Sequence, residues 1–276
     1  MICAPIPGAG KKATPTAMKN RERMNKMKIT LLGTAHGYQT YNRFVSSSMI
    51  EVNGKMYIVD AGPPVDGLLI RQGKDVKQLT AVFITHMHED HAGSLPGIIK
   101  CLNRHPYDDQ HTHFVMPQEG AFEALCAWSQ ALHTTNRPHL VSHNVAKDGE
   151  VCYDDGTLKV TAIGNNHIPA EEGHHSFSYL LEAEGKSVLF TGDLSFGCAD
   201  FPMIGTERHI DLCVCESAHI TPENTLDKLM RCDFGALVLQ HLHEKWHGEG
   251  EQVLYNSYCS VPYPLSIGHD GDVFEI

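Results

Sequence analysis

The chain lacks any apolar run near the roughly 20 residues that cross a bilayer. It also lacks a Cys-x-x-Cys pair, and its nine cysteines are scattered and odd in number. This usage is typical of a reducing compartment and indicates no disulfide framework. The N-terminus lacks the apolar segment of a secretory signal. We therefore expect a cytoplasmic protein without membrane contact.

Basic residues are scarce over most of the chain. Residues 1–28 hold seven of the 22 Lys and Arg residues and only one acid, so residues 29–276 carry a formal charge of −17. Such a body repels a long polyanion, and no basic patch is visible in the sequence. The composition argues against a general nuclease, although a short nucleotide end could still enter a metal site. No long nucleic acid is expected as a partner.

The N-terminal segment differs from the rest of the chain. Residues 1–27 combine basic residues with Pro, Gly, Ala and Thr and show no apolar period. We expect a disordered basic tail there, and a later natural start at Met24 or Met27 is an open alternative. No linker divides residues 28–276, so we expect one domain over that range.

Strand and helix signals alternate along residues 28–276. Asn53-Gly54 joins the apolar segments 44–52 and 55–59 and is the strongest short hairpin signal. The other expected strands are 28–33, 79–85, 113–116, 158–163, 177–182, 188–191, 211–215, 236–240 and 264–267, and the expected helices are 65–72, 95–102, 118–133 and 222–231. This order suits two sheets packed face to face with helices outside. The expected fold class is α/β.

The helix expected at 118–133 carries an apolar stripe at helical spacing. Its members are Phe122, Leu125, Trp128 and Leu132. We expect these side chains in the core rather than around a ligand. The following segment, 134–144, is expected to be irregular. Cys213 and Cys215 lie on one face of a strand, and we expect two core thiols rather than a zinc site there.

The most informative segment is Thr85-His-Met-His-Glu-Asp-His91, which follows an apolar strand. Alternate side chains at a strand end point the same way, so His86 and His88 can converge on one ion. The turn that follows can direct Asp90 and His91 toward a second position. Imidazole nitrogen and carboxylate oxygen suit Zn²⁺, so the segment predicts a metal site.

A third imidazole is needed to complete a first metal position. His167 follows the expected strand 158–163, and a loop at a strand end can hold a ligand rigidly. His174 and His175 compete for the same role, and we prefer His167.

Two further strands end in metal-binding residue types. The strand 188–191 delivers Asp193 through a Gly turn, and the strand 236–240 runs into His241. His243 is two residues further and could share the face of His241, so it competes with it. His269 is another competitor, although the Asp-Gly that follows it indicates a turn first.

These motifs resemble a known family. His86-x-His88-x-Asp90-His91 resembles the H-x-H-x-D-H signature of the metallo-β-lactamase superfamily, and Thr191-Gly-Asp193 looks like its T-G-D motif. The resemblance implies a four-layer αββα sandwich with two metal ions at one edge. It implies one zinc at His86, His88 and His167, the other at Asp90, His91 and His241, and Asp193 as the bridge. Mn²⁺ or Fe²⁺ in place of Zn²⁺ is not excluded.

Other segments look like one branch of that superfamily. Gly33-Thr-Ala-His-Gly37 with Arg43 and Ser46-Ser-Ser48 looks like the opening of the phosphodiesterase and tRNA 3′-end-processing ribonuclease branch. Asp211 to Ala218 resembles the acidic motif of that branch, and Gln240-His-Leu-His243 resembles its final ligand segment.

One departure from that branch concerns tRNA. Only 26 positions separate His167 from Asp193, which leaves room for a hairpin but not for the long tRNA-gripping arm of the ribonucleases. Two roles stay open. Arg43 could touch phosphate or be a structural loop residue, and His219 could be a proton donor near Glu216 or a solvated surface histidine.

The resemblance implies a zinc-dependent metallohydrolase. A hydroxide bound by both ions would attack the substrate, with Asp90 as the catalytic residue that orients or deprotonates it. We expect a small phosphodiester or nucleotide-type substrate. The alternatives are an acyl hydrolase (thioesterase, lactonase or β-lactamase-like) on the same site and, third, a non-catalytic zinc-binding protein. The expected partners are a small anionic substrate and, at most, a second copy of the chain.

Overall fold

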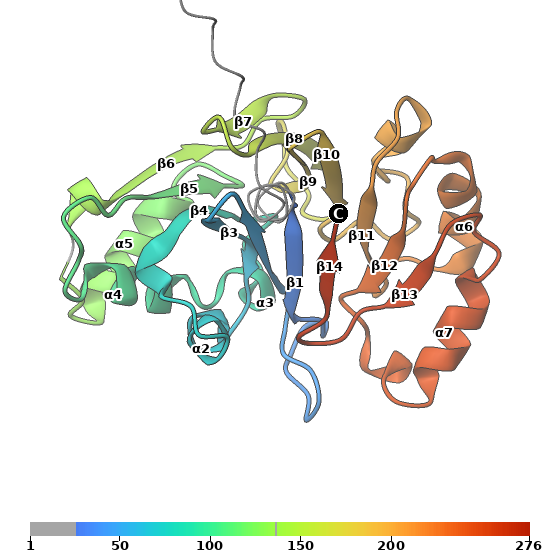
Figure 1. Ribbon diagram of the computed structural model, residues 1–276, viewed down its shortest axis with the longest axis horizontal. Coiled ribbons are helices and arrows are strands. Elements are labelled where there is room, and N and C mark those ends of the chain that lie inside the picture. The colour runs from blue at the N-terminus through green and yellow to red at the C-terminus, as the bar shows by residue number, and fades with distance from the viewer. Residues whose placement is uncertain (1–25, 136) are drawn as a thin grey trace, which may run out of the picture.

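The computed structural model describes residues 26–276 except residue 136, and Figure 1 shows the arrangement of its elements. Two sheets of seven strands each lie in the described part of the chain. The first has the order β14-β1-β2-β3-β4-β5-β6 and the second the order β13-β12-β11-β10-β9-β8-β7. Both sheets pass from antiparallel pairs to parallel pairs, so the chain builds a similar half twice.

The first sheet contains β1 (Lys28–Gly33), β2 (Ser47–Val52), β3 (Lys55–Ala61), β4 (Leu79–Phe83), β5 (Thr112–Met116), β6 (Val141–Val145) and β14 (Val273–Glu275). The second contains β7 (Val151–Asp154), β8 (Lys159–Asn165), β9 (Ser176–Ala183), β10 (Lys186–Phe190), β11 (Leu212–Glu216), β12 (Leu237–Gln240) and β13 (Leu265–Ile267). From β3 to β6 and from β10 to β13 the strands are parallel, so their carboxyl ends meet at one edge of each sheet.

Helices cover the outer face of each sheet. The α-helices are α2 (Val65–Arg71), α3 (Glu89–Ala92), α4 (Leu95–Asn103), α5 (Ala121–Ala131), α6 (Pro222–Arg231) and α7 (Gly250–Tyr258), and short 3₁₀ turns are η1 (Val76–Gln78), η2 (Pro138–Leu140), η3 (Met203–Thr206) and η4 (Glu244–Trp246). Figure 1 shows α2, α4 and α5 on one side of the sheets and α6 and α7 on the other. None of the helices in the described ranges is long and apolar enough to cross a membrane.

Three apolar cores hold these layers together. The central core lies between the sheets and includes Tyr57, Phe83 and Tyr179. A second core packs α2, α4 and α5 on the first sheet, and a third packs α6 and α7 on the second. Strands buried on both faces carry nearly continuous apolar runs, as β4 and β10 do. The predicted αββα sandwich of class α/β is therefore confirmed.

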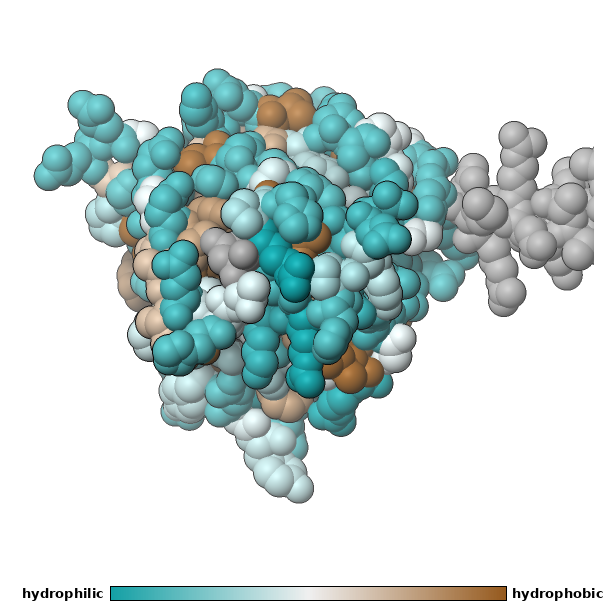
Figure 2. Space-filling view, turned by 90° about the vertical axis from the view of Figure 1, so that its left-hand side faces the viewer, coloured by the Kyte–Doolittle hydropathy of each residue, from teal (hydrophilic) through white to brown (hydrophobic). Residues whose placement is uncertain are grey.

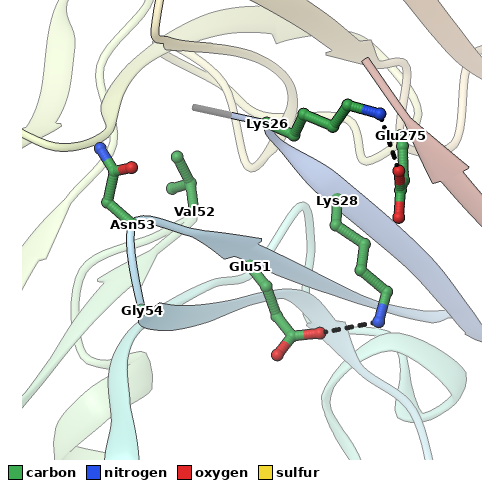
Figure 3. Close-up of a pocket in the computed structure, with 7 residues that line it drawn as sticks. All are labelled: Lys26, Lys28, Glu51, Val52, Asn53, Gly54 and Glu275. Carbon is green, nitrogen blue, oxygen red and sulfur yellow. Dashed lines mark hydrogen bonds and ion pairs between the residues drawn. The ribbon is translucent and has the colours of Figure 1, made fainter. Parts of the chain in front are cut away.

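The predicted Asn53-Gly54 hairpin is present between β2 and β3. Asn53 has φ 51° and Gly54 has φ 79°, which is the pair of left-handed residues that a tight hairpin turn requires. Figure 3 shows the surface hollow beside this turn, where Lys26 pairs with Glu275 and Lys28 pairs with Glu51. Because both cations are paired with carboxylates, this hollow offers no free positive charge to an anionic ligand.

The predicted apolar stripe on α5 is only half correct. Phe122 and Leu125 are buried in the core, but Trp128 and Leu132 are 58% and 53% exposed. Ser129 is buried together with Phe122 and Leu125, so the buried face of the helix runs through these positions and not through Trp128. Figure 2, which shows the molecule from this side, is mainly hydrophilic with scattered hydrophobic residues.

Two expectations about local structure need comment. The segment 134–144 is not wholly irregular, because η2 and the start of β6 lie within it. Cys213 and Cys215 are fully buried and unpaired in the core over α6 and α7, as expected for structural thiols. Residues 1–25 of the predicted tail lie outside the described residues, whereas Met27 is buried and its N–H donates to the Ile276 carbonyl at 3.3 Å.

Candidate metal centre

All seven residues predicted as ligands converge in the structure. They come from segments that follow the carboxyl ends of β4, β8, β10 and β12, where both sheets present their loops to the same edge of the sandwich. The four residues of the motif after β4 lie on the first sheet's side. The other three, which follow β8, β10 and β12, lie on the second sheet's side. The cluster therefore spans the two halves of the fold.

The first group contains His86, His88, His167 and Asp193. One ligand atom from each lies within 4.8 Å of the others. His86 Nε2 is 3.0 Å from His88 Nδ1, and His167 Nε2 is 3.3 Å from the same His88 atom. The Nε2 atoms of His86 and His167 are each 3.7 Å from Asp193 Oδ2. Three imidazole nitrogens thus face one another around a carboxylate.

The second group contains Asp90, His91 and His241 and adjoins the same carboxylate. His91 Nε2 is 3.6 Å from Asp90 Oδ2 and 3.4 Å from Asp193 Oδ1. His241 Nε2 is 3.9 Å from Asp90 Oδ2 and 3.1 Å from Asp193 Oδ2. Asp193 is the member common to both groups.

The polar atoms at the centre of this cluster fit a bound cation. His91 Nε2, His241 Nε2 and Asp193 Oδ1 are buried, yet each lacks a hydrogen-bond partner within the described part of the chain. An unsatisfied buried polar group is costly, and several such atoms aimed at one another are what metal ligands require. Imidazole and carboxylate donors in this number suit Zn²⁺.

The charge states of His86 and Asp193 agree with such a site. His91 differs, because Asp193 and Asp60 raise its pKa well above the ordinary value although burial opposes this. Burial lowers the pKa of the His86 imidazole well below its ordinary value, and the neighbouring His91 adds to the effect. Burial alone would raise the pKa of Asp193, but His241 and His91 hold it well below its ordinary value. An uncharged imidazole beside an ionised carboxylate is the state that binds a metal cation.

Asp60 positions this cluster, and the sequence analysis did not single it out. It is buried at the end of β3, and its carboxylate lies 2.7 Å from His91 Nδ1. The same carboxylate accepts hydrogen bonds from the backbone N–H of Thr85 at 2.8 Å and from its hydroxyl at 2.9 Å. Asp60 therefore holds His91 with Nε2 directed into the cluster. In the sequence, Asp60 could be recognised only as an acid directly after an apolar strand. Acids at ordinary turns show the same pattern.

We expect Asp60→Ala to weaken metal binding by about 10- to 100-fold, the usual loss when an orienting carboxylate of a ligating histidine is removed. Asp60→Asn keeps a hydrogen-bond acceptor at this position and should lose less. Competition with a chromophoric chelator measures the affinity, with Asp109→Ala, at an exposed loop carboxylate, as the control. Unchanged affinity in Asp60→Ala would contradict the orienting role.

The backbone at the site is held in unusual conformations. Asp60 has φ 60° and His241 has φ 53°, a left-handed region that costs a non-glycine residue about 1 kcal/mol. His241 is fixed by Ser46, whose Oγ lies 2.5 Å from its Nδ1. At Gly192, φ is 57°, and an added Cβ would lie 2.7 Å from the Phe177 carbonyl oxygen, so a glycine is needed before Asp193.

The competing histidines lie elsewhere. His174 Nδ1 bonds the Asn165 carbonyl at 2.8 Å, and its ring packs on Gly164. His269 Nε2 lies 2.9 Å from Glu251 and is half exposed. His243 stacks on His36 rather than facing Asp193. None of the three belongs to the groups of possible ligands found among the described residues, and neither does His175.

Glu216 and His219 border the cluster. Glu216 is buried and accepts hydrogen bonds from the backbone N–H groups of Leu194 at 3.0 Å, Ala218 at 2.7 Å and His219 at 2.9 Å. His219 Nδ1 lies 3.3 Å from Glu216 Oε1 and 3.7 Å from Asp193 Oδ2. His219 is thus part of the site's rim and not a solvated surface histidine. Although burial opposes it, the neighbouring Glu216 carboxylate raises the pKa of His219.

His36 completes the rim on the other side. With His219 and His241 it forms a third group whose ligand atoms lie within 4.8 Å of one another. Burial lowers the pKa of His36 to about 4, and His241 and His219 contribute to this. His36 is therefore an uncharged imidazole at neutral pH. The sequence analysis quoted it only within a segment that resembled a family.

Arg43 proves to be a structural residue. It is 3% exposed, and its guanidinium donates to Thr34 Oγ1 at 2.6 Å, to the Gly268 carbonyl at 2.5 Å and to Glu251 Oε1 at 2.6 Å. All its described partners lie within the protein, so it is not available to bind phosphate. It ties the loop after β1 to the segment after β13.

One small basic hollow was not visible in the sequence. It lies between the ends of α4 and α5, measures about 660 Å³ and is lined by Lys100, Arg104 and Arg137 among others. The sequence shows no such patch because the cations that line this hollow come from separate segments. The fold brings together cations that are up to 37 positions apart in the chain.

The αββα sandwich with a His/Asp cluster at one edge defines the class of a metallohydrolase. A family model described as the metallo-beta-lactamase superfamily matches residues 40–241. Because the match covers most of the chain, this chain belongs to the metallo-β-lactamase superfamily.

Known proteins similar to this chain come from the ribonuclease Z and phosphodiesterase branch. Ribonuclease Z of Prochlorococcus marinus (strain NATL1A) is 29% identical over 169 residues, which cover 59% of this chain and 52% of the relative. The human tRNase Z short form has a TM-score of 0.69 at 19% identity, covering 90% of this chain and 98% of that one. A diphosphatase from the PhnP family has a TM-score of 0.67 at 16% identity, covering 91% and 97%. The chain spans about half the length of the curated relatives it matches.

Proposed function

We propose that this protein is a zinc-dependent hydrolase that holds two divalent cations and acts on a small phosphodiester or nucleotide-type substrate. The proposed first cation is held by His86, His88 and His167, the second by Asp90, His91 and His241, and Asp193 is shared by both. The observation that carries the proposal is the convergence of these side chains around buried polar atoms that have no hydrogen-bond partner among the described residues. Mn²⁺ or Fe²⁺ would suit several of the same donors.

Paired divalent cations would supply an activated water and would stabilise the negative charge that develops on the substrate. The proposed catalytic residue of the chain is Asp90, whose carboxylate would orient the water and accept its proton. Its Oδ2 accepts the backbone N–H of Gly37 at 2.8 Å, which fixes the carboxylate before substrate arrives. This is the kind of positioning that a general base needs.

His219 is proposed to protonate the leaving oxygen. It lies on the rim of the cluster, and Glu216 fixes its orientation and supports a proton on its ring. Phe196 and His36 lie on either side of it, with ring centroids at 5.3 Å and 5.2 Å, so that water has limited access. A proton donor beside the proposed metal ligands lowers the barrier to departure of an alkoxide.

Two observations favour a small phosphodiester. The relatives are named as ribonucleases Z and zinc phosphodiesterases, and the charge of −17 over residues 29–276 disfavours a long polyanion. Between His167 and Asp193 the chain forms only a loop and the β9–β10 hairpin, which belongs to the second sheet. No segment of that interval projects as a separate arm.

The test combines metal analysis with a panel of substrates. Purified protein that has not met a chelator should contain about two equivalents of zinc by elemental mass spectrometry. It should hydrolyse bis-p-nitrophenyl phosphate faster than a thioester or a chromogenic β-lactam. Preference for the acyl substrates would favour an acyl hydrolase on the same site, and no turnover of any of them by a zinc-loaded sample would favour a non-catalytic zinc-binding protein.

A further inference from the structure

Four aromatic rings form a line beside the proposed metal ligands, and none of the four belongs to the proposed ligand set. We call them the aromatic wall, and they are Phe196, His219, His36 and His243. The centroids of Phe196 and His219 are 5.3 Å apart, those of His219 and His36 are 5.2 Å apart, and those of His36 and His243 are 5.5 Å apart. These separations are typical of aromatic rings in direct contact.

The wall is assembled from four separate loops. They follow β1, β10, β11 and β12, and each contributes one ring at the carboxyl end of its strand. Contacts between rings from loops so far apart in the chain require the complete fold. The wall is therefore a tertiary feature, and the sequence alone does not reveal it.

The wall borders the proposed metal centre directly. His219 Nδ1 lies 3.7 Å from Asp193 Oδ2, and its ring centroid is 4.6 Å from that of His167. The His36 ring is 5.0 Å from that of His241. A group bound against the wall would therefore lie beside a phosphate bound at the proposed metal ligands.

Phe196 is the exposed end of the wall, with 83% of its surface accessible. Its loop is nevertheless fixed. Asp200 accepts the Ser195 backbone N–H at 3.0 Å and the Ser195 hydroxyl at 2.8 Å, and it accepts the Asn166 N–H at 2.7 Å. On the other side Cys198 is buried. A well-anchored loop thus presents a large apolar ring to solvent at the mouth of the site.

Single exposed aromatic residues are common and need no explanation by themselves. Phe196 differs because its ring meets His219 nearly edge to face, at 78°, and so continues a row of rings that leads to the cluster. The exposed face of the Phe196 ring, next to a centre proposed to cleave phosphate esters, is complementary to a nucleobase or another planar ring. A substrate without a ring would leave this surface unused.

We propose that the aromatic wall binds the planar ring of the substrate by stacking, so that the preferred substrates are phosphodiesters of nucleosides, with Phe196 as a specificity-determining residue. This inference rests on the proposed function for the nature of the cleaved bond. Stacking is tolerant of base identity because every base has a π face, so the wall selects for a base without selecting its sequence. Phe196, His36 and His243 hold the ring and take no part in bond breaking, whereas His219 also has the role of proton donor proposed above.

The kinetic test compares two substrates with the same leaving group. Thymidine 5′-p-nitrophenyl phosphate carries a base, and methyl p-nitrophenyl phosphate does not. The zinc-loaded protein should prefer the nucleoside ester by about tenfold in kcat/KM, and Phe196→Ala should remove that preference mainly through KM. Phe196→Tyr should retain it. Trp128→Ala, which removes another exposed aromatic residue on α5, is the matched control and should change neither substrate.

A binding measurement separates this inference from the proposed function. Isothermal titration of thymidine 5′-monophosphate should show about tenfold weaker binding to Phe196→Ala than to the unchanged protein, and methyl phosphate should show no difference. If no phosphodiester is cleaved but this binding difference is present, the inference that the wall binds a ring is supported and the proposed reaction is wrong. If Phe196→Ala has equal effects on both members of each pair, or none, the wall does not select a ring and the inference is wrong.

Discussion

Asp90→Ala should lower turnover by about 10³-fold while the fold persists. The expected size follows from the contribution of a positioned general base, which is roughly 10²- to 10⁴-fold. Asp90 is buried, but the one hydrogen bond that its side chain is shown to accept comes from Gly37 at 2.8 Å. Its removal should therefore leave the two sheets intact. Turnover of bis-p-nitrophenyl phosphate and thermal unfolding are the measurements.

Two further variants make this result decisive. Asp90→Asn keeps the shape of the side chain but cannot take a proton, so it should be nearly as inactive as Asp90→Ala. Asp109→Ala removes an exposed carboxylate in a loop and should leave the rate unchanged. Near-normal turnover in either variant at position 90 would rule out the role of Asp90 as a base.

The second large effect is expected at His167. His167→Ala should weaken the binding of one cation by more than about 100-fold, which exceeds the usual loss from removing a residue that only orients a ligand. Turnover should fall with it, because the first group would keep only two imidazoles. Elemental analysis after dialysis should find about one metal equivalent per chain in place of two.

His174→Ala is the matched control for this prediction. His174 belongs to the same loop and is bonded to the Asn165 carbonyl, but it is not in either group of converging atoms. Its loss should change metal content and rate by less than about threefold, the scale of an ordinary surface substitution. The reverse pattern, with His174 the more important residue, would transfer the ligand role from His167.

The sequence predicted the position of the site better than its surroundings. The residues from His86 to His91, with His167, Asp193 and His241, could be found because each follows an apolar strand. Strand ends at one edge of parallel sheets meet in space, so a local pattern was sufficient to bring distant residues together. Their roles as ligands remain proposals that the metal measurements test.

The supporting residues could not be predicted in this way. Asp60, His36 and Phe196 act through contacts with residues from other loops, and a single Asp, His or Phe carries no local pattern. For Arg43 the sequence left two roles open, and its hydrogen bonds within the protein decide for the structural one. Partners on distant segments decide such roles, and these partners appear only in the fold.

The missed elements have a common physical cause. β6, β7 and β14 lie at or beside sheet edges, where one or both faces are open to solvent, so their sequences lack continuous apolar runs. α7 has a weak apolar period, with Leu254 and Tyr258 as its buried residues. Trp128 was misjudged because the buried face of α5 runs through Phe122, Leu125 and the small polar Ser129, which an apolar pattern does not include.

The division of the seven donors between the two sheets has a mechanical consequence. Apart from these donors, the sheets meet mainly through the apolar side chains of the central core. The proposed first cation would join His86 of the first half to His167 of the second, and the proposed second cation would join His91 to His241, so each would link the two halves. Binding of the cations and packing of the two sheets would then be thermodynamically coupled. Removal of the cations by a chelator would weaken the packing of one sheet against the other.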